Sequence, residues 1–268
     1  MFFENSYSIY EAQVDPKIEF SVKKWLNNEL PAASFRNSYN YSFIHKCEKK
    51  CDIEDSSLRL VYIVKSSTKH FDRREAIRNS WGFEKRFSDV EIRTIFVLGI
   101  DEEYEIQQKI NEESKLKGDI VQANFKDNYY NNTIKTMISI EWAVKYCSHA
   151  KFYYFSDDDM YVSTKNVLRF IRNPLEYPGY YNSDDFRSSK RMKDLLDVEL
   201  RDDTELYAGY VFKNTRPLRS RFSKCSEFYF YKKSYEPYSY RYVIASHGFD
   251  DPKELRWVWN DQKSLGNA

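Results

Sequence analysis

Short apolar stretches alternate with amphipathic stretches through the middle of this chain. The apolar runs are rich in branched and aromatic residues and have the length of buried strands. The predicted elements are, in chain order, strand 58–64, helix 71–81, strand 92–98, helix 102–117, strand 119–124, helix 133–147, strand 151–155 and helix 166–171. Strands that alternate with helices in this way predict βαβ units and a mostly parallel sheet.

Several residues mark the expected ends and faces of these elements. Asp72 is placed to cap the first helix and Gly82 to end it. Gly99 is placed to close the strand 92–98. The helix over 133–147 carries an apolar face at spacings of three and four, which we expect to pack on the sheet. That face consists of Met137, Ile140, Val144 and Cys147.

The flanks of this central part have weaker patterns. Residues 1–57 are rich in polar and aromatic residues with little periodicity, and only 22–30 has a helical pattern. Residues 174–201 are polar and irregular, which predicts a loop insertion, while 205–213 and 228–231 are candidates for further strands. We therefore expect a stem-like or peripheral N-terminal region before the α/β domain.

Composition narrows the class of protein. The chain has 268 residues with 42 basic and 41 acidic side chains, so its net charge of +1 gives no footprint of a nucleic-acid binder. An aromatic fraction of 18% offsets the low mean hydropathy of −0.75 and indicates a Tyr-rich core. No run approaches the roughly 18–20 apolar residues that cross a bilayer, and the first residues lack an export signal.

Four cysteines leave the redox chemistry open, because they allow three full pairings. They are Cys47, Cys51, Cys147 and Cys225. The first two lie four residues apart, which suits a local disulfide, half of a metal site, or two free thiols. Zinc is the least favoured of these because no second Cys or His pair lies nearby.

The sharpest chemical feature is the acidic triplet Asp157, Asp158 and Asp159 at the end of a predicted strand. Ligands of open α/β sheets bind beyond the carboxyl ends of strands. Adjacent carboxylates repel one another, so they need a cation, protonation or full solvation. Asp157 and Asp159 have the spacing of a D-x-D metal loop, and a divalent ion that bridges to a diphosphate would relieve the repulsion. The alternative is a solvated acidic turn.

Two further motifs carry cations and an acid near strand ends. Arg74 and Arg78 lie four residues apart on one face of the first helix, where guanidinium groups suit phosphate oxygens. The alternative is a helix face with local ion pairs. Asp127 follows the third predicted strand, and Lys135 lies early in the long helix.

In this order, the motifs resemble those of the family-31 glycosyltransferases, the β1,3-galactosyltransferases and β1,3-N-acetylglucosaminyltransferases. The stretches that carry the resemblance are RREAIRNSWG at 73–82, DNYYNNTIKT at 127–136 and DDDMYV at 157–162. Ser80 stands for the family's Thr and Asn132 for its Leu, while Cys147 matches a cysteine that the family carries before the acidic tract. The resemblance covers about residues 58–246.

The resemblance implies a fold, a reaction and a place of action. The fold is GT-A, a Rossmann-like mixed α/β sheet with helices on both faces that binds a nucleotide-sugar. The reaction transfers galactose or N-acetylglucosamine from a UDP-sugar to a glycan acceptor on a glycoprotein or glycolipid, in β1,3 linkage with inversion and with Mn²⁺. Members are anchored in the Golgi membrane and act on its lumenal side, although this sequence shows no anchor. The implied site comprises Asp157 and Asp159 for the metal, and Arg74, Arg78, Asp127, Lys135 and Asp158 for the UDP-sugar.

Departures from the family pattern begin near Tyr235. The family's glycines are missing between Tyr235 and Ser246. The family also carries a Glu-Asp pair that resembles its catalytic base region, and the 22 residues after Ser246 contain no such dipeptide. We therefore expect a transferase domain over 58–246, a divergent tail over 247–268, a truncated C-terminal end and an unidentified base. The alternative functions are a non-catalytic relative that binds nucleotide-sugar or a partner without turnover, and a generic Ca²⁺-binding acidic loop.

Overall fold

The computed structural model describes residues 24, 40–52, 58–172 and 235–268. The chain divides into two units after Asn40, and the sheet and the helices belong to the unit that begins at Tyr41. Several sequence predictions lie outside the described residues: the helix over 22–30 apart from Lys24, the insertion at 174–201, the strands at 205–213 and 228–231, and Cys225.

A five-stranded sheet forms the centre of this unit, in the spatial order β1-β4-β3-β2-β5. The strands are β1 (Phe43–His45), β2 (Leu58–Lys65), β3 (Glu91–Ile100), β4 (Ile120–Lys126) and β5 (Phe152–Asp157). Strands β2 to β5 are all parallel, and β1 pairs antiparallel with β4 at one edge. The mostly parallel α/β class predicted from the sequence is confirmed.

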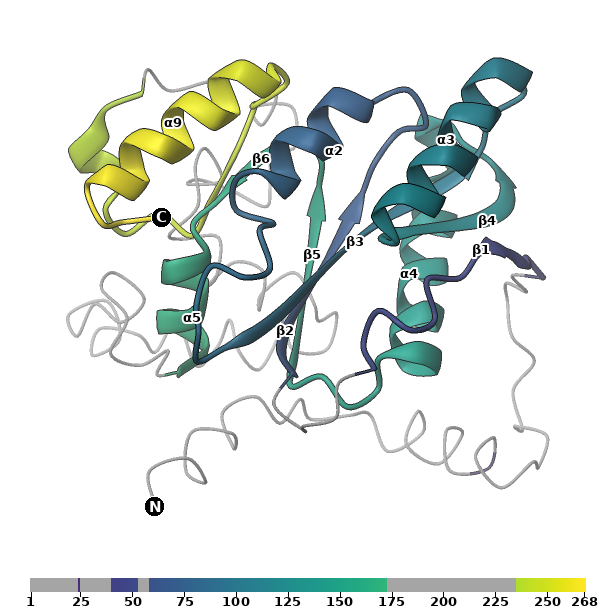
Figure 1. Ribbon diagram of the computed structural model, residues 1–268, viewed down its shortest axis with the longest axis horizontal. Helices are drawn as coiled ribbons and strands as arrows, with labels where there is room; N and C mark the ends of the chain where they lie inside the picture. The colour runs from purple at the N-terminus through teal and green to yellow at the C-terminus, as the bar shows by residue number, and fades with distance from the viewer. Residues whose placement is uncertain (1–23, 25–39, 53–57, 173–234) are drawn as a thin grey trace, which may run out of the picture. The chain divides into compact units, whose positions relative to one another are not determined.

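Helices cover both faces of the sheet (Figure 1). Helices α2 (Phe71–Arg78) and α3 (Tyr104–Lys117) pack on one face, whereas α4 (Asn132–Tyr146) packs on the other. The alternation of side chains along each strand produces the two cores. Along β2, for example, Tyr62 belongs to the core under α2 and Ile63 to the core under α4.

A second, smaller layer closes one end of the sheet. It contains the antiparallel pair β6 (Met160–Val162) and β7 (Ala245–His247), together with α5 (Thr164–Arg172) and α9 (Pro252–Ser264). Two short 3-10 turns complete the described elements, η2 (Tyr129–Asn131) and η5 (Pro237–Tyr240). In the described part of the chain, no helix combines the length and apolar character needed to cross a bilayer.

Helix α9 is part of the domain core. Its buried side chains Leu255, Val258 and Trp259 join the same core as Ala76 and Ile77 of α2. Figure 1 shows α9 alongside the sheet next to α2. The segment 247–268, which the sequence predicts to be a divergent tail, thus belongs to the compact unit that begins at Tyr41.

The predicted apolar face of the helix over 133–147 is wrong for three of its four residues, since only Cys147 is buried. Met137, Ile140 and Val144 are 39%, 42% and 64% exposed, whereas Ile138 and Trp142 are fully buried. Both faces of this helix carry apolar residues at helical spacing, so periodicity could not select the one that meets the sheet. Lys135 lies on the buried face, which matters for the site.

Two local predictions are also corrected. Asp72 is not the N-cap of α2: that position is His70, and Asp72 lies in the first turn, where it accepts a hydrogen bond from the Arg73 amide. Gly99 does not end β3, which continues to Ile100. Its missing side chain instead serves a close approach, since a Cβ there would lie 2.6 Å from the carbonyl oxygen of Phe125 on β4.

The cysteines pair over a long distance. Cys51 and Cys147 form a disulfide across a sequence separation of 96, with their Cα atoms 5.4 Å apart. Cys47 carries a free thiol that donates to the carbonyl oxygen of Gly118 at 2.7 Å. A local disulfide, half of a metal site and two free thiols were the three predictions for Cys47 and Cys51. All three are wrong for Cys51, because its partner is Cys147 at the end of α4.

Candidate active site at the carboxyl edge of the sheet

The predicted site residues gather where the parallel strands end. The chain runs from β2 outward to β3 and β4 on one side, and then returns to place β5 on the other side of β2. The strand order therefore reverses between β2 and β5, and the crevice at such a switch point is where open α/β sheets bind ligands. Lys65 ends β2 and Asp157 ends β5, and these two residues are register partners.

The outer two acids of the triplet each contact a basic side chain from another segment. Lys65 Nζ lies 3.0 Å from Asp157 Oδ1, and the Asp157 side chain is 51% exposed. His247 Nε2 lies 2.9 Å from Asp159 Oδ2, and this hydrogen bond raises the pKa of His247. The repulsion expected within the triplet is thus relieved in part by the protein itself.

Asp158, the middle acid, is buried and held by four donors. Its Oδ2 accepts from Ser66 Oγ at 2.7 Å, from the Ser67 amide at 3.3 Å and from His70 Nδ1 at 2.8 Å, and its Oδ1 accepts from Arg73 at 3.1 Å. Burial alone would raise the pKa of Asp158, but the hydrogen bonds from His70 and Ser66 and the nearby charges hold it below its ordinary value. This carboxylate is therefore ionised and fixed in place.

Arg73 connects the acidic turn to the C-terminal segment. Besides Asp158, its guanidinium contacts Asp250 Oδ1 at 2.9 Å, and its side chain is 17% exposed. The backbone amide of Phe249 also donates to the carbonyl oxygen of Asp159 at 2.8 Å. The residues that lead from β7 into α9 thus form a wall of the site.

Arg74 and Arg78 share one helix face, as predicted, but both are engaged by protein groups. Arg74 is fully buried, and its Nη2 and Nε lie 2.7 and 3.0 Å from the two carboxylate oxygens of Glu113 on α3. Arg78 pairs with Asp119 at 2.7 Å and also contacts Glu113. In this state neither guanidinium is open to a phosphate, so the geometry favours scaffolding roles for both, and direct donor contacts by them stay a prediction.

Lys135 and Asp127 form a buried ion pair beneath the same edge. Lys135 Nζ lies 2.9 Å from Asp127 Oδ1 and donates to the carbonyl oxygen of Ser66 at 2.7 Å. The Gly99 amide donates to Asp127 Oδ2 at 2.8 Å. This network ties the end of β2 to the ends of β3 and β4, so the structure brings these two predicted residues together as supports of the site.

The acidic turn has capacity for a metal ion, although it does not form a complete cage. No group of three or more His, Cys, Asp and Glu side chains in the described residues could hold a metal ion alone. Asp159 Oδ1, however, is buried without a hydrogen-bond partner, and Asp157 is half-exposed. Two carboxylates with substrate phosphates and water are a common ligand set for a hard divalent cation. The donor chemistry therefore fits a metal that binds together with a diphosphate.

Sequence reasoning missed five residues of this site, namely Lys65, Ser66, His70, Arg73 and His247. Lys65 ends β2, Ser66 and His70 lie in the connection that follows, and Arg73 lies in the first turn of α2. Their position at the carboxyl end of a parallel strand was itself a signal. His247 had no local signal, because only the pairing of β6 with β7 brings it to the acidic turn.

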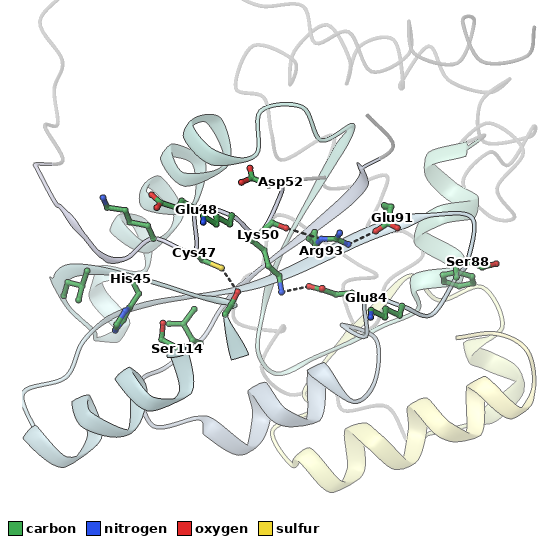
Figure 2. Close-up of a pocket in the computed structure, with 17 residues that line it drawn as sticks. His45, Cys47, Glu48, Lys50, Asp52, Glu84, Ser88, Glu91, Arg93 and Ser114 are labelled. Carbon is green, nitrogen blue, oxygen red and sulfur yellow. Dashed lines mark hydrogen bonds and ion pairs between the residues drawn. The ribbon is translucent and has the colours of Figure 1, made fainter. Parts of the chain in front are cut away.

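A cavity in the described part of the molecule lies elsewhere. It measures about 1050 Å³ and lies near the amino ends of β3 and β4, with lining residues that include His45, Cys47 and Ser114 (Figure 2). Lys50 pairs with Glu84 at 2.9 Å and Arg93 with Glu91 at 2.7 Å, so these charges are satisfied within the cavity wall. No acid of the triplet 157–159 lines it.

Comparisons with known proteins identify the family of the chain. The family model described as galactosyltransferase matches residues 72–179. The β-1,3-galactosyltransferase brn of Drosophila melanogaster is 36% identical over 258 residues, covering 80% of this chain and 77% of that protein. Human β-1,3-galactosyltransferase 1 is 28% identical, with 85% of this chain and 80% of that protein covered.

A third relative differs in the sugar that its name prints. Human lactosylceramide 1,3-N-acetyl-β-D-glucosaminyltransferase is 31% identical over 208 residues, which cover 75% of this chain and 46% of that protein. The fold, the site and these matches define a glycosyltransferase of the α/β class, and hence a hexosyltransferase enzyme. The chain belongs to the galactosyltransferase family, the family-31 glycosyltransferases.

Proposed function

We propose that this protein transfers galactose or N-acetylglucosamine from a UDP-sugar to a glycan acceptor, in β1,3 linkage and with inversion, on a GT-A fold. The observation that carries the proposal is the acidic turn 157–159 at the switch point of a parallel sheet. The names of the relatives support the linkage, and they leave the choice between the two sugars to experiment.

We propose that Asp157 and Asp159 hold Mn²⁺, with His247 beside them. The ion, when bound, would neutralise charge on the leaving diphosphate. Asp159 would offer its unpartnered oxygen, and Asp157 would exchange Lys65 for the ion. Inverting transfer also needs a carboxylate that removes the proton of the acceptor hydroxyl. No described residue is assigned to that role.

The donor site proposed here has two layers. Asp158 and Arg73 lie at the edge and would face the UDP-sugar. The second layer would hold that edge in place through ion pairs within the protein. It consists of Arg74, Arg78, Asp127 and Lys135.

We propose the Golgi lumen as the place of action. The disulfide Cys51–Cys147 supports an oxidising compartment, since such bonds are rare in the reducing cytosol. A glycan acceptor on a glycoprotein or glycolipid is available there.

The test is a transfer assay with purified protein, Mn²⁺, UDP-galactose or UDP-N-acetylglucosamine, and a panel of β-linked sugar acceptors. We expect a β1,3-linked product by NMR, no product in the presence of a chelator, and at least a 100-fold loss in Asp159→Ala, a magnitude typical of removing one electrostatic group. Asp52→Ala, at an exposed acid away from the carboxyl edge, is the control and should behave as the native protein. A folded protein that binds UDP with Mn²⁺ but transfers no sugar would be a non-catalytic relative.

A further inference from the structure

The short loop Ser66–Thr68, between β2 and α2, is reached by buried cations from both faces of the sheet. Arg74 approaches from α2 on one face, and Lys135 approaches from α4 on the other. Ser66 is itself only 2% exposed. It is therefore the point at which the two supports of the carboxyl edge meet.

The support from α2 is fixed by an ion pair. The Arg74 guanidinium is held by both carboxylate oxygens of Glu113. Its Nη1 then donates to Ser66 Oγ at 3.1 Å and to the carbonyl oxygen of Ser67 at 2.6 Å. A planar group held bidentately on one side offers its remaining donors in fixed directions.

The support from α4 acts on the backbone of the same residue. Lys135 Nζ donates to the carbonyl oxygen of Ser66 at 2.7 Å while Asp127 holds the ammonium group. Ser66 is thus positioned by one buried ion pair through its hydroxyl and by another through its carbonyl group.

The direction of the Ser66 hydrogen bonds follows from chemistry. A guanidinium cannot accept a hydrogen bond, so Ser66 Oγ must accept from Arg74 and has one proton left to donate. The carboxylate of Asp158 lies 2.7 Å away, whereas the alternative acceptor, the carbonyl oxygen of Ser67, lies 3.4 Å away. A short bond to a charged acceptor is the stronger of the two.

We propose that Ser66 is a positioning residue that transmits the rigidity of two buried ion pairs, Arg74–Glu113 and Lys135–Asp127, to the Asp158 carboxylate. The inference rests on the proposed function, since Asp158 is expected to face the donor. It gives a role to two buried motif residues from different helices, Arg74 and Lys135: both hold Ser66, which is one of the four donors to Asp158.

The test compares Ser66→Ala with Ser163→Ala. Ser163 is also fully buried and donates one hydrogen bond, to the carbonyl oxygen of Asn267 at 2.6 Å, but it does not contact the acidic turn. Both variants lose a buried hydroxyl and should show similar falls in melting temperature. We expect only Ser66→Ala to lose kcat, by about 10- to 100-fold with little change in the donor KM, as is typical of outer-shell partners. Ser66→Thr, which retains the hydroxyl, should recover most of it.

Two results would overturn the inference: equal kcat values in the two alanine variants, or a Ser66→Thr variant that folds as the native protein does but is no more active than Ser66→Ala. If the native protein transfers no sugar at all, the proposed function fails first. The positioning role is then judged by crystal structures of the native protein and of Ser66→Ala. A new side-chain conformation of Asp158 above an unchanged Ser66–Thr68 loop supports it, and an unchanged Asp158 refutes it.

Discussion

Single side chains in this site divide into those that face the crevice and those that hold them. Asp157 and Arg73 reach the surface, whereas Arg74 and Lys135 are buried, with every nitrogen engaged by a protein acceptor. A motif in the sequence does not distinguish these roles, because a buried scaffold residue and an exposed ligand residue can stand in adjacent positions. Arg73 and Arg74 are the clearest case.

Replacing Lys135 with Met should cost stability because Asp127 would keep its charge in a buried place. Breaking a buried ion pair in this way costs about 3–5 kcal/mol. Urea unfolding followed by tryptophan fluorescence would measure the loss. Lys126→Met is the matched control, because Lys126 pairs with Glu102 at a distance of 2.8 Å and both side chains are more than half exposed. Its cost should stay below about 1 kcal/mol. Equal losses in the two variants would contradict the buried pair.

The Cys47 thiol should resist alkylation in the folded protein. Burial raises its pKa to about 12 from an ordinary value of 9.0. The thiolate is the nucleophile, so a raised pKa leaves the group protonated and unreactive at pH 8.5. We expect iodoacetamide to modify the Cys47 peptide slowly at that pH, faster as the pH approaches the raised pKa, and rapidly once urea unfolds the chain. Mass spectrometry of that peptide gives the rates. A rapid reaction of the native protein at pH 8.5 would show that the thiol is open to solvent.

At the scale of elements, the sequence predicted the strands better than the helix faces. Short apolar runs between polar loops define β2 to β5 almost uniquely, because a parallel sheet buries both faces of its strands. The buried face of helix α4 could not be predicted from periodicity. The helix has two apolar stripes, and the stripe that meets the sheet depends on which strands lie beneath it. The place of the acids at the end of β5 was predicted together with the strand, because they follow its apolar run directly in the sequence. The partner of Asp159 was not predicted, because His247 is 88 residues from it in the chain.

Gly99 provides a test of how tightly β3 and β4 approach. A Cβ at this position would lie 2.6 Å from the carbonyl oxygen of Phe125 in β4 and 2.9 Å from the amide of Asp127, just after β4, and both are backbone atoms. Gly99→Ala should therefore cost about 3 kcal/mol or more, at the upper end for overpacking. Gly118→Ala is the control, because that glycine has a φ of +61° with nothing within 4 Å of a Cβ, and only backbone strain of about 1–2 kcal/mol is expected. A larger loss at Gly118 than at Gly99, by thermal or urea unfolding, would reject the close approach.

For the whole molecule, the site is assembled from segments that only the complete fold brings together. The loop after β2, the acidic turn after β5 and the strand β7 each supply groups to the site. The sequence could predict the first two from the rule that ligands bind at the carboxyl ends of strands. It could not predict the third, because a short antiparallel pair such as β6 and β7 leaves no periodic signal that distinguishes it from other short apolar stretches.

The Cys51–Cys147 disulfide should stabilise this assembly without contributing to the site. It joins the turn after β1 to the end of α4 and closes a loop across 96 positions, for which the chain-entropy model gives about 4–5 kcal/mol. Cys147 lies five positions before β5 begins, at the opposite end of that strand from the acidic turn. We therefore expect the double variant Cys51→Ser/Cys147→Ser, or the reduced native protein, to lose about 2–5 kcal/mol of unfolding free energy. The donor KM should stay unchanged at temperatures where the protein is folded. Cys47→Ser is the control: it should keep the full response to reductant. A urea midpoint that does not move when reductant is added would show that the bond is not formed.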